Sequence, residues 1–138
     1  MSQRATSSGD IPIATADPFI SLSPRENARV VVWLLEHSDR PKVAVRVWAA
    51  LLEFLDTNDP HNVLMREQIA EVVRTKPSEV SRIMSNLGSI GAVTTRRDNS
   101  VGRRGPATVI YFVNPRIATV LTGEERELAQ AAAPALGI

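Results

Sequence analysis

Apolar residues recur at three- and four-residue intervals along two stretches of the N-terminal half, and this period predicts helices with one buried face. The first predicted helix covers 24–38: Ser23 caps it, Pro24 suits its first position and Glu26 completes a capping-box pattern. The second predicted helix covers 41–56. The apolar positions are Val30, Val31, Trp33, Leu34 and Leu35 in the first helix, and Val43, Val47, Ala50, Leu51, Phe54 and Leu55 in the second.

The helical period continues over 65–90, where a short polar break at Arg74-Thr75-Lys76 interrupts it. Pro77 follows the break, and a proline at the first position of a helix has no amide hydrogen to leave unpaired. Glu79 then lies in the first turn, where the helix dipole favours a negative charge. Two short helices joined by a tight turn are therefore predicted. We expect Ile69, Ala70, Val72, Val73, Val80, Ile83, Met84 and Leu87 to be buried, and Ser78, Ser81, Arg82, Ser85 and Asn86 to face outward.

The pattern then changes from a helical to a strand-like one. Residues 92–98 and 108–114 are rich in Val and Thr, and the second stretch adds Ile and aromatic residues, so both are predicted to be strands. Between them lies most of the stretch RRDNSVGRRGPA, residues 96–107, which has four arginines and two glycines. The sequence therefore predicts a hairpin with a long basic tip.

Two short motifs follow the hairpin. Asn114-Pro115 predicts a short helical turn. Thr122-Gly123-Glu124-Glu125 resembles a second capping box, so it predicts the start of a last helix that ends near Ala132.

The order of these elements is helix, short helix, tight turn, helix and hairpin, which is the order of a winged helix-turn-helix. We therefore predict a mainly α-helical α+β fold with a small β-hairpin. Glycine is frequent in the turn of this motif, and here the position holds Arg74. The predicted organisation is a flexible arm at 1–22, a winged helix-turn-helix domain at 23–122 with the helix-turn-helix at 65–90 and the wing at 92–114, and a C-terminal helix and tail at 123–138.

Composition excludes several classes of protein. A chain of 138 residues with 43% hydrophobic residues is typical of one globular domain, and the absence of cysteine excludes disulfides and thiolate metal sites. No apolar run approaches the length of a membrane span, and the N-terminus has no apolar core of a signal peptide. The expected location is the cytoplasm, in association with the nucleoid or a plasmid, and no membrane partner is expected.

Charge is distributed unevenly, although the net charge is only +1. Residues 62–116 have nine basic and four acidic residues, a net charge of +5, whereas 1–61 and 117–138 each have a net charge of −2. Such segregation produces a positive field over one part of the surface and is the expected electrostatic footprint of a nucleic-acid-binding protein.

This layout predicts how the chain binds duplex DNA. A helix fills the major groove, and its outward residues reach the base edges, while a basic wing lies over the backbone or enters the minor groove. Arg82 is the candidate for two hydrogen bonds to a guanine. The predicted contacts are Thr75, Lys76, Ser78, Ser81, Arg82 and Ser85 in the recognition helix and its start, and Arg96, Arg97, Arg103 and Arg104 in the wing. Because Arg96 and Arg97 alternate along a strand, only one of them is expected to face the DNA.

Two stretches resemble known families. MREQIAEVVRTKPSEVSRIMSNLGSIGAV resembles the helix-turn-helix of MarR-like winged-helix regulators. LLEFLDTNDPHNVLMREQIA and YFVNPRIA are more similar to RepL-type plasmid replication proteins. The resemblance covers about 42–118 and implies double-stranded DNA binding without catalysis by the chain itself.

Other classes of function have less support in the sequence. Of the two histidines, His37 lies near a helix end and His61 lies in a loop; neither belongs to a metal-ligand pair at helical spacing, and there is no glycine-rich phosphate loop. We therefore predict no enzymatic activity, no metal and no cofactor. A protein-protein interaction module would carry apolar or aromatic residues on the outward helix face, and here that face is Ser, Arg and Asn.

The expected partners are double-stranded DNA and a second copy of the chain, since helix-turn-helix proteins usually read two half-sites as a two-fold dimer. The first helix, 24–38, and the Ala-rich tail, 128–136, are the spare apolar elements for such an interface. The primary prediction is a transcriptional regulator at a promoter or operator, and the alternative is a RepL-type replication initiator at an origin. The sequence leaves the target site, the sign of regulation and any small-molecule effector open.

Overall fold

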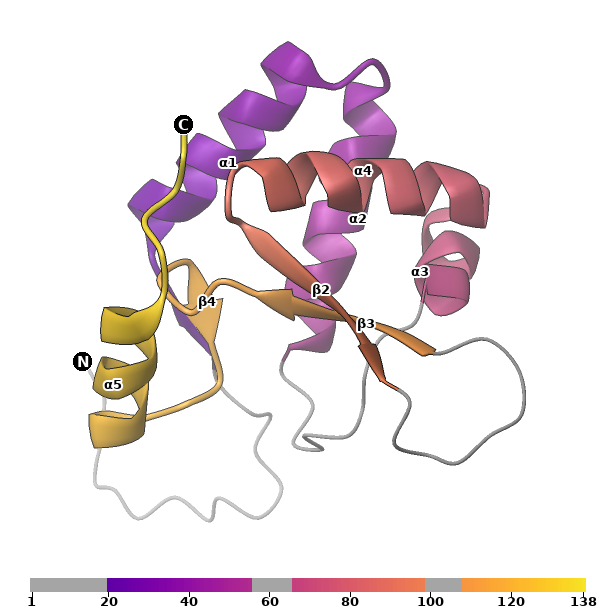
Figure 1. The fold of residues 1–138 in the computed structure, drawn as a ribbon. Coiled ribbons are helices and arrows are strands. Elements are labelled where there is room, and N and C mark those ends of the chain that lie inside the picture. Colours follow the sequence, from indigo (N-terminus) through magenta and orange to yellow (C-terminus); the bar gives the residue numbers. More distant parts are fainter. Residues whose placement is uncertain (1–19, 56–65, 99–107) are drawn as a thin grey trace, which may run out of the picture.

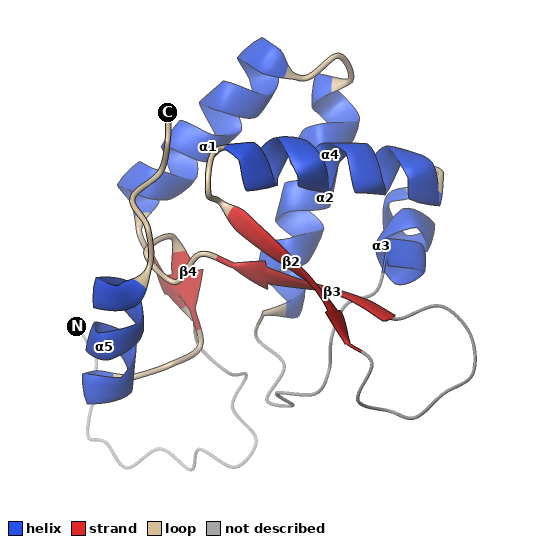
Figure 2. Cartoon of the chain, viewed as in Figure 1, coloured by secondary structure: helices blue, strands red, loops and turns tan. Residues whose placement is uncertain are grey.

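A computed structural model describes residues 20–55, 66–98 and 108–138, and within them the chain forms five helices and two small antiparallel pairs of strands (Figures 1 and 2). The prediction of a mainly helical α+β fold with a small hairpin is confirmed. The elements are β1 (Ser21–Leu22), α1 (Pro24–His37), α2 (Pro41–Phe54), α3 (Arg66–Val73), α4 (Pro77–Ser89), β2 (Val93–Asp98), β3 (Thr108–Val113), β4 (Ala118–Thr119) and α5 (Gly123–Ala132).

Helix α2 is central to the core, because it contacts α1, α3 and α4. Its Trp48 is 1% exposed, and the indole Nε1–H donates a hydrogen bond of 2.7 Å to Oδ1 of Asn27 on α1. This bond satisfies the buried indole donor and orients α1 against α2. The buried residues predicted for α3 and α4 are confirmed except Val72, which is 52% exposed. The short α3 faces the core through Ile69, Ala70 and Val73, and the prediction for Val72 was therefore wrong.

Helices α3 and α4 both end in a Schellman motif. In α3, the Thr75 amide donates to the Ala70 carbonyl (2.9 Å) and the Arg74 amide to the Glu71 carbonyl (3.3 Å). Arg74 has φ of 63°, so it occupies the left-handed position that usually holds glycine. Helix α4 ends in the same way around Gly91, whose φ is 79°. The turn between α3 and α4 is therefore tight without a glycine.

The hairpin lies directly after α4. Its strands β2 and β3 pair in antiparallel register from Val93 opposite Val113 to Asp98 opposite Thr108. Strand β2 contacts α4, and Figure 1 shows the hairpin crossing beneath α4, with α3 to one side. The predicted hairpin is confirmed, and its tip, 99–107, lies outside the described residues.

The two predicted capping boxes differ in the structure. At α1, the Ser23 hydroxyl accepts a hydrogen bond of 3.2 Å from the Glu26 amide, as the prediction required. At α5, Thr122 is the N-cap residue but its side chain makes no capping bond, so the second capping box is a wrong prediction. Gly123 follows Thr122 with a φ of 58°, which is not a helical value, and the first turn of α5 departs there from the regular geometry that a capping bond needs.

The chain ends of the domain are tied together. Ser21 and Leu22, which were predicted to belong to the arm, form β1 and pair with Thr119 and Ala118 of β4. The Ser23 amide continues this pairing with a hydrogen bond of 2.8 Å to the Ile117 carbonyl.

Asn114 connects the end of the hairpin, the end of α4 and the C-terminal tail. It is 5% exposed, and its side-chain amide donates to the carbonyls of Gly91 and Pro134 at 2.9 Å each. Its side-chain oxygen accepts a bond of 2.8 Å from the Arg116 amide. This buried side chain is fully hydrogen-bonded, which is how a polar group is accommodated in a core.

Helix α5 is peripheral, and none of its residues is buried. Polar bonds hold it, among them Arg126 to the Ser21 hydroxyl (2.9 Å) and Gln130 to the Pro115 carbonyl (3.1 Å). The tail behind it contributes Leu136 to the core. None of the helices in the described ranges is long and apolar enough to cross a membrane.

Candidate nucleic-acid interface

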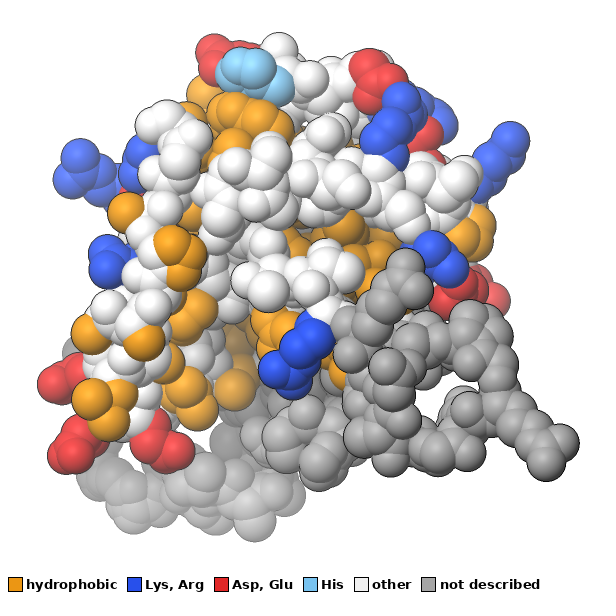
Figure 3. Space-filling model, viewed as in Figure 1, with side chains coloured by type: hydrophobic (Ala, Val, Ile, Leu, Met, Phe, Trp, Pro, Cys, Tyr) orange, Lys and Arg blue, Asp and Glu red, His pale blue; other side chains and the backbone are white. Residues whose placement is uncertain are grey.

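The outer face of α4 is polar and open. Ser78 and Ser85 are exposed, and Lys76, the N-cap residue of α4, is exposed beside them. Thr75 is half-buried in the turn between α3 and α4. In Figure 3, the visible surface over α4 is mainly white, the colour of the backbone and of side chains that are neither apolar nor charged. The structure thus brings these four predicted residues together along one surface of the turn and helix.

Arg82 also lies on this face, but its guanidinium is engaged. Nη1 is 2.5 Å from Oδ2 of Asp39 in the turn between α1 and α2, and Nη2 is 2.5 Å from Oε2 of Glu79 on α4. The hydrogen bond with Glu79 is the main cause that raises the pKa of Arg82 above its ordinary value; partial desolvation opposes it and Asp39 adds to it. The side chain therefore remains a donor, while two carboxylates balance its charge.

Ser81 is half-buried, and its hydroxyl is engaged by a neighbouring element rather than freely exposed as the sequence predicted. Its hydroxyl accepts a hydrogen bond of 3.1 Å from Nη1 of Arg66 at the start of α3, and it lies near the Tyr111 phenol on β3. Burial raises the pKa of the Tyr111 phenol, and the nearby Arg66 opposes the shift. Ser81 therefore joins α4 to α3 and the hairpin, and it is half-buried because α4 presents this side to its neighbours.

The predicted wing arginines are only partly described. Arg96 is exposed, and its guanidinium carbon lies 4.9 Å from the centroid of the Phe112 ring, a cation–π contact. Arg96 pairs with Ile110 in the hairpin, and paired residues share one face of a sheet. Arg96 therefore lies on the face opposite to that of Tyr111, which is near Ser81 of α4. Arg97 pairs with Val109 through the backbone, and its side chain lies outside the described part, as do Arg103 and Arg104 entirely.

The residues that hold the site were not predicted from the sequence. Glu79 was assigned only to the helix dipole, yet it pairs with Arg82 and, through Oε1, with Nη1 of Arg40 at 3.3 Å. The spacing of Glu79 and Arg82, three residues apart on one helix, was a usable signal. Asp39 and Arg66 come from other elements, and no local spacing links them to α4.

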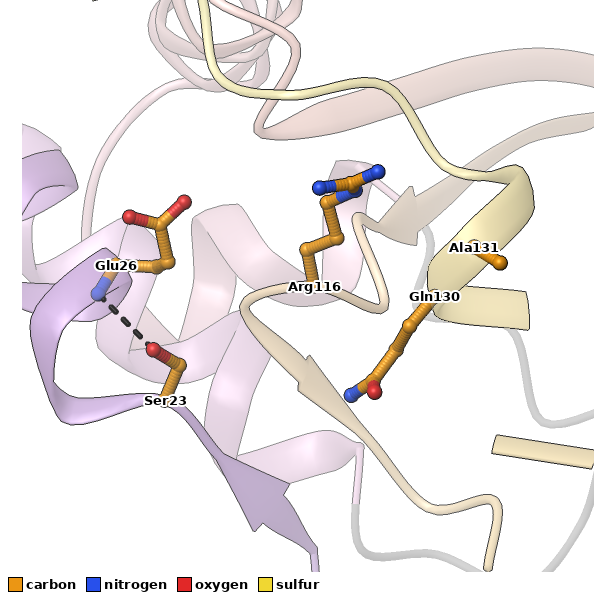
Figure 4. A pocket seen from close by; sticks show the side chains of 5 residues that line it. All are labelled: Ser23, Glu26, Arg116, Gln130 and Ala131. Carbon is orange, nitrogen blue, oxygen red and sulfur yellow. Dashed lines mark hydrogen bonds between the residues drawn. The ribbon is translucent and has the colours of Figure 1, made fainter. Parts of the chain in front are cut away.

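A polar cavity of about 500 Å³ lies away from α4, between the start of α1, the turn after β3 and α5. Figure 4 shows Glu26 from α1 and Gln130 from α5 on either side of Arg116. Both charged groups already have partners: Glu26 pairs with Arg29 at 2.9 Å, and Nε of Arg116 donates to the Ala133 carbonyl at 2.8 Å. The charged groups of this cavity are therefore paired within the fold, and the cavity is separate from the α4 surface.

The described residues contain no group of three or more His, Asp or Glu side chains that could hold a metal ion. His37 stacks on Trp33 with ring centroids 4.9 Å apart, and its Nδ1 lies 3.0 Å from the Trp33 carbonyl. These contacts give His37 a structural role at the end of α1. His61 lies outside the described residues.

Comparison of the chain with models of protein families, with curated proteins and with solved structures finds no match. The function is therefore inferred from the residues and contacts of this chain.

Proposed function

We propose that the protein is a winged helix-turn-helix that binds specific double-stranded DNA as a homodimer and regulates transcription at a promoter or operator. Helix α4 is the recognition helix in this proposal, and the β2–β3 hairpin is the wing. Helix α3 packs behind α4 and leaves the outer face of α4 open to the major groove.

One observation carries the proposal: an exposed, polar helix face begins at a basic N-cap and lies beside a basic hairpin. Lys76 is exposed at the N-cap of α4, and Ser78 and Ser85 follow on the same face. Short hydroxyl side chains permit close approach to DNA, and a cation at the start of the helix suits a phosphate contact. This face has no large apolar side chain, which argues against a protein-interaction role for it.

The proposed dimer uses α1 and the C-terminal segment. Val32 and Leu35 lie three residues apart on α1 and are 50% and 54% exposed. Leu128 on α5 is 65% exposed, and the Ile138 carbonyl lies 3.4 Å from Nη2 of Arg29 on α1. The end of the tail therefore reaches α1, and the exposed apolar residues of α1 and of the C-terminal segment are the surfaces proposed for a second copy.

A role at a replication origin has weaker support. The Asn-Pro motif suggested that alternative, and here Asn114 is accounted for by three side-chain bonds within the fold. The position of the bound sites separates the two roles: a single palindrome over a promoter favours regulation, whereas repeats inside or beside the protein's own gene favour replication.

The function is tested by selection from a random duplex DNA pool at near-physiological salt, followed by sequencing of the retained molecules. We expect an enriched two-fold motif with half-sites about one helical turn apart. Retention without enrichment would leave only a non-specific binder, and no retention would overturn the proposal.

The dimer is tested by light scattering on Leu35→Asp. The variant is expected to be monomeric, because a charge in an apolar interface lacks a partner. Val72→Asp is the matched control, since Val72 is 52% exposed on α3 and lies outside the proposed interface. A dimeric Leu35→Asp variant, or a monomeric wild-type protein, would refute this interface.

A further inference from the structure

Four charged side chains form a linear chain of ion pairs at the edge of the α4 face, and we call it the Arg82 cluster. Asp39 and Arg40 come from the turn between α1 and α2, and Glu79 and Arg82 come from α4. The contacts run from Asp39 to Arg82 (2.5 Å), from Arg82 to Glu79 (2.5 Å) and from Glu79 to Arg40 (3.3 Å). The charges of the two acids and the two bases cancel. The cluster therefore adds no net charge to this surface, but it orients the Arg82 guanidinium.

The two carboxylates differ in their surroundings. The Glu79 side chain is 10% exposed, lies in the first turn of α4 and binds both arginines. The Asp39 side chain is 61% exposed at the rim. Glu79 is thus built into the fold, whereas Asp39 touches the cluster only through Arg82 among the described residues.

The guanidinium keeps donors for another acceptor. Arginine has five N–H groups, and the contacts with Asp39 and Glu79 use one on each terminal nitrogen. Three N–H groups remain, and the side chain is 48% exposed, so solvent or a ligand reaches it. A guanine presents two acceptors, O6 and N7, to such a fork in the major groove.

Building on the proposed function, we propose that Asp39 is a positioning residue for Arg82. Together with Glu79, it holds the guanidinium in one orientation on the α4 face, from which the remaining N–H groups read a guanine. An unrestrained arginine loses rotamer freedom on binding and also reaches phosphates and other bases. A restrained arginine has lost that freedom in advance, and it has fewer alternative acceptors. Asp39 therefore raises specificity without touching DNA.

The experiment compares the affinity for the duplex selected from the random pool with the affinity for a scrambled duplex of the same composition. The variants are Asp39→Asn, Arg82→Ala and the double variant. Glu53→Gln is the matched control: Glu53 is exposed on α2, no described residue forms a salt bridge with it, and the net charge changes by the same amount. The ratio of the two affinities cancels the general effect of removing one negative charge.

We expect Asp39→Asn to lower this ratio about 2- to 10-fold, which corresponds to ordering one long side chain. The loss should be confined to the base pair at which Arg82→Ala also loses discrimination, and Glu53→Gln should leave the ratio unchanged. In the Arg82→Ala background, Asp39→Asn should have no further effect on the ratio. A purely structural role would weaken all base pairs equally, so the position-specific loss is the decisive readout.

Three results would overturn this inference without overturning the proposed function. The affinity ratio could stay unchanged in Asp39→Asn, or it could rise, which would mean that Asp39 competes with guanine for Arg82. The third such result is a base preference that does not change in Arg82→Ala. If the wild-type protein and all variants bind no duplex, the proposed function fails and the inference fails with it. Thermal unfolding of each variant separates these outcomes from loss of fold.

Discussion

At the scale of single residues, the backbone conformation of Arg74 is the least expected feature. The left-handed region costs a residue with a Cβ atom about 1–2 kcal/mol, yet Arg74 has φ of 63° and closes α3. The tight turn after Ala70 and the buried start of α4 hold it there, since Val80 is fully buried only three residues into that helix. Tertiary packing therefore decides this conformation against local preference.

Replacing Arg74 with glycine should stabilise the protein. We expect Arg74→Gly to raise the free energy of unfolding by about 0.5–1 kcal/mol, because relief of the left-handed strain exceeds the entropic cost of glycine. Urea denaturation followed by circular dichroism measures it. Arg74→Ala keeps the Cβ atom and is the control, for which no gain is expected. An equal gain in both variants would show that the side chain, rather than φ, is responsible.

A second residue-scale prediction concerns Asn114. Asn114→Ala removes both donors to the carbonyls of Gly91 and Pro134 and the acceptor for the Arg116 amide. A hydrogen bond contributes about 0.5–1.5 kcal/mol, so from the loss of these bonds we expect a decrease of about 2–4 kcal/mol in denaturant unfolding. Asn86→Ala, on the partly exposed side of α4, should stay within about 0.5 kcal/mol of the wild type. A similar small loss for Asn114→Ala would contradict its central role.

At the scale of elements, sequence period predicted the helices and strands well, and their caps less well. Helix bounds agree within about two residues, because the apolar stripes of α2 and α4 match the faces that are buried. In α1, only Val30 and Leu34 of the apolar positions are buried, and Leu35 is exposed. Ser23 and Thr122 have the same capping-box spacing, yet only Ser23 makes the bond. Ser23 lies between β1 and α1, where the pairing with β4 holds the backbone in place.

The two caps give a matched pair of variants. Ser23→Ala should lower the free energy of unfolding by about 1 kcal/mol, since it removes the bond to the Glu26 amide. Thr122→Ala should change it by less than about 0.3 kcal/mol, because its side chain makes no capping bond. Thermal unfolding of both variants measures the difference. Equal losses would mean that Thr122 caps α5 in solution.

At the scale of the whole molecule, charge is the property that links the fold to the proposed function. The net charge of +5 in residues 62–116 is concentrated in the segment that forms α3, α4 and the hairpin. Arg66 and Arg82 pair with Glu67 and Glu79, which this net charge already counts, while Asp39 and Arg40 from outside the segment offset each other. The basic character of the proposed interface therefore depends strongly on Lys76 and on the arginines of the hairpin.

Removing the two arginines of the wing tip should weaken DNA binding regardless of sequence. For Arg103→Ala plus Arg104→Ala, we expect lower affinity for every duplex and a salt dependence whose slope decreases by up to about 2, since each phosphate that is no longer neutralised accounts for about 0.9. Titrations at several salt concentrations measure the slope. Lys42→Ala plus Arg46→Ala removes two exposed cations of α2 and is the matched control. Wild-type binding by the tip variant at every salt concentration would exclude the tip from the interface.

The sequence by itself determined the element order, the buried faces of α2 and α4, the hairpin and the basic segment, because each depends on a period or composition that extends over neighbouring residues. Only the tertiary structure decided which side chains of α4 remain available. Ser81 turned towards Arg66 and Tyr111, and Arg82 became fixed between Asp39 and Glu79. These contacts join residues that are distant in the chain, and their geometry is set by how α1, α3 and the hairpin pack around α4, which no local pattern encodes.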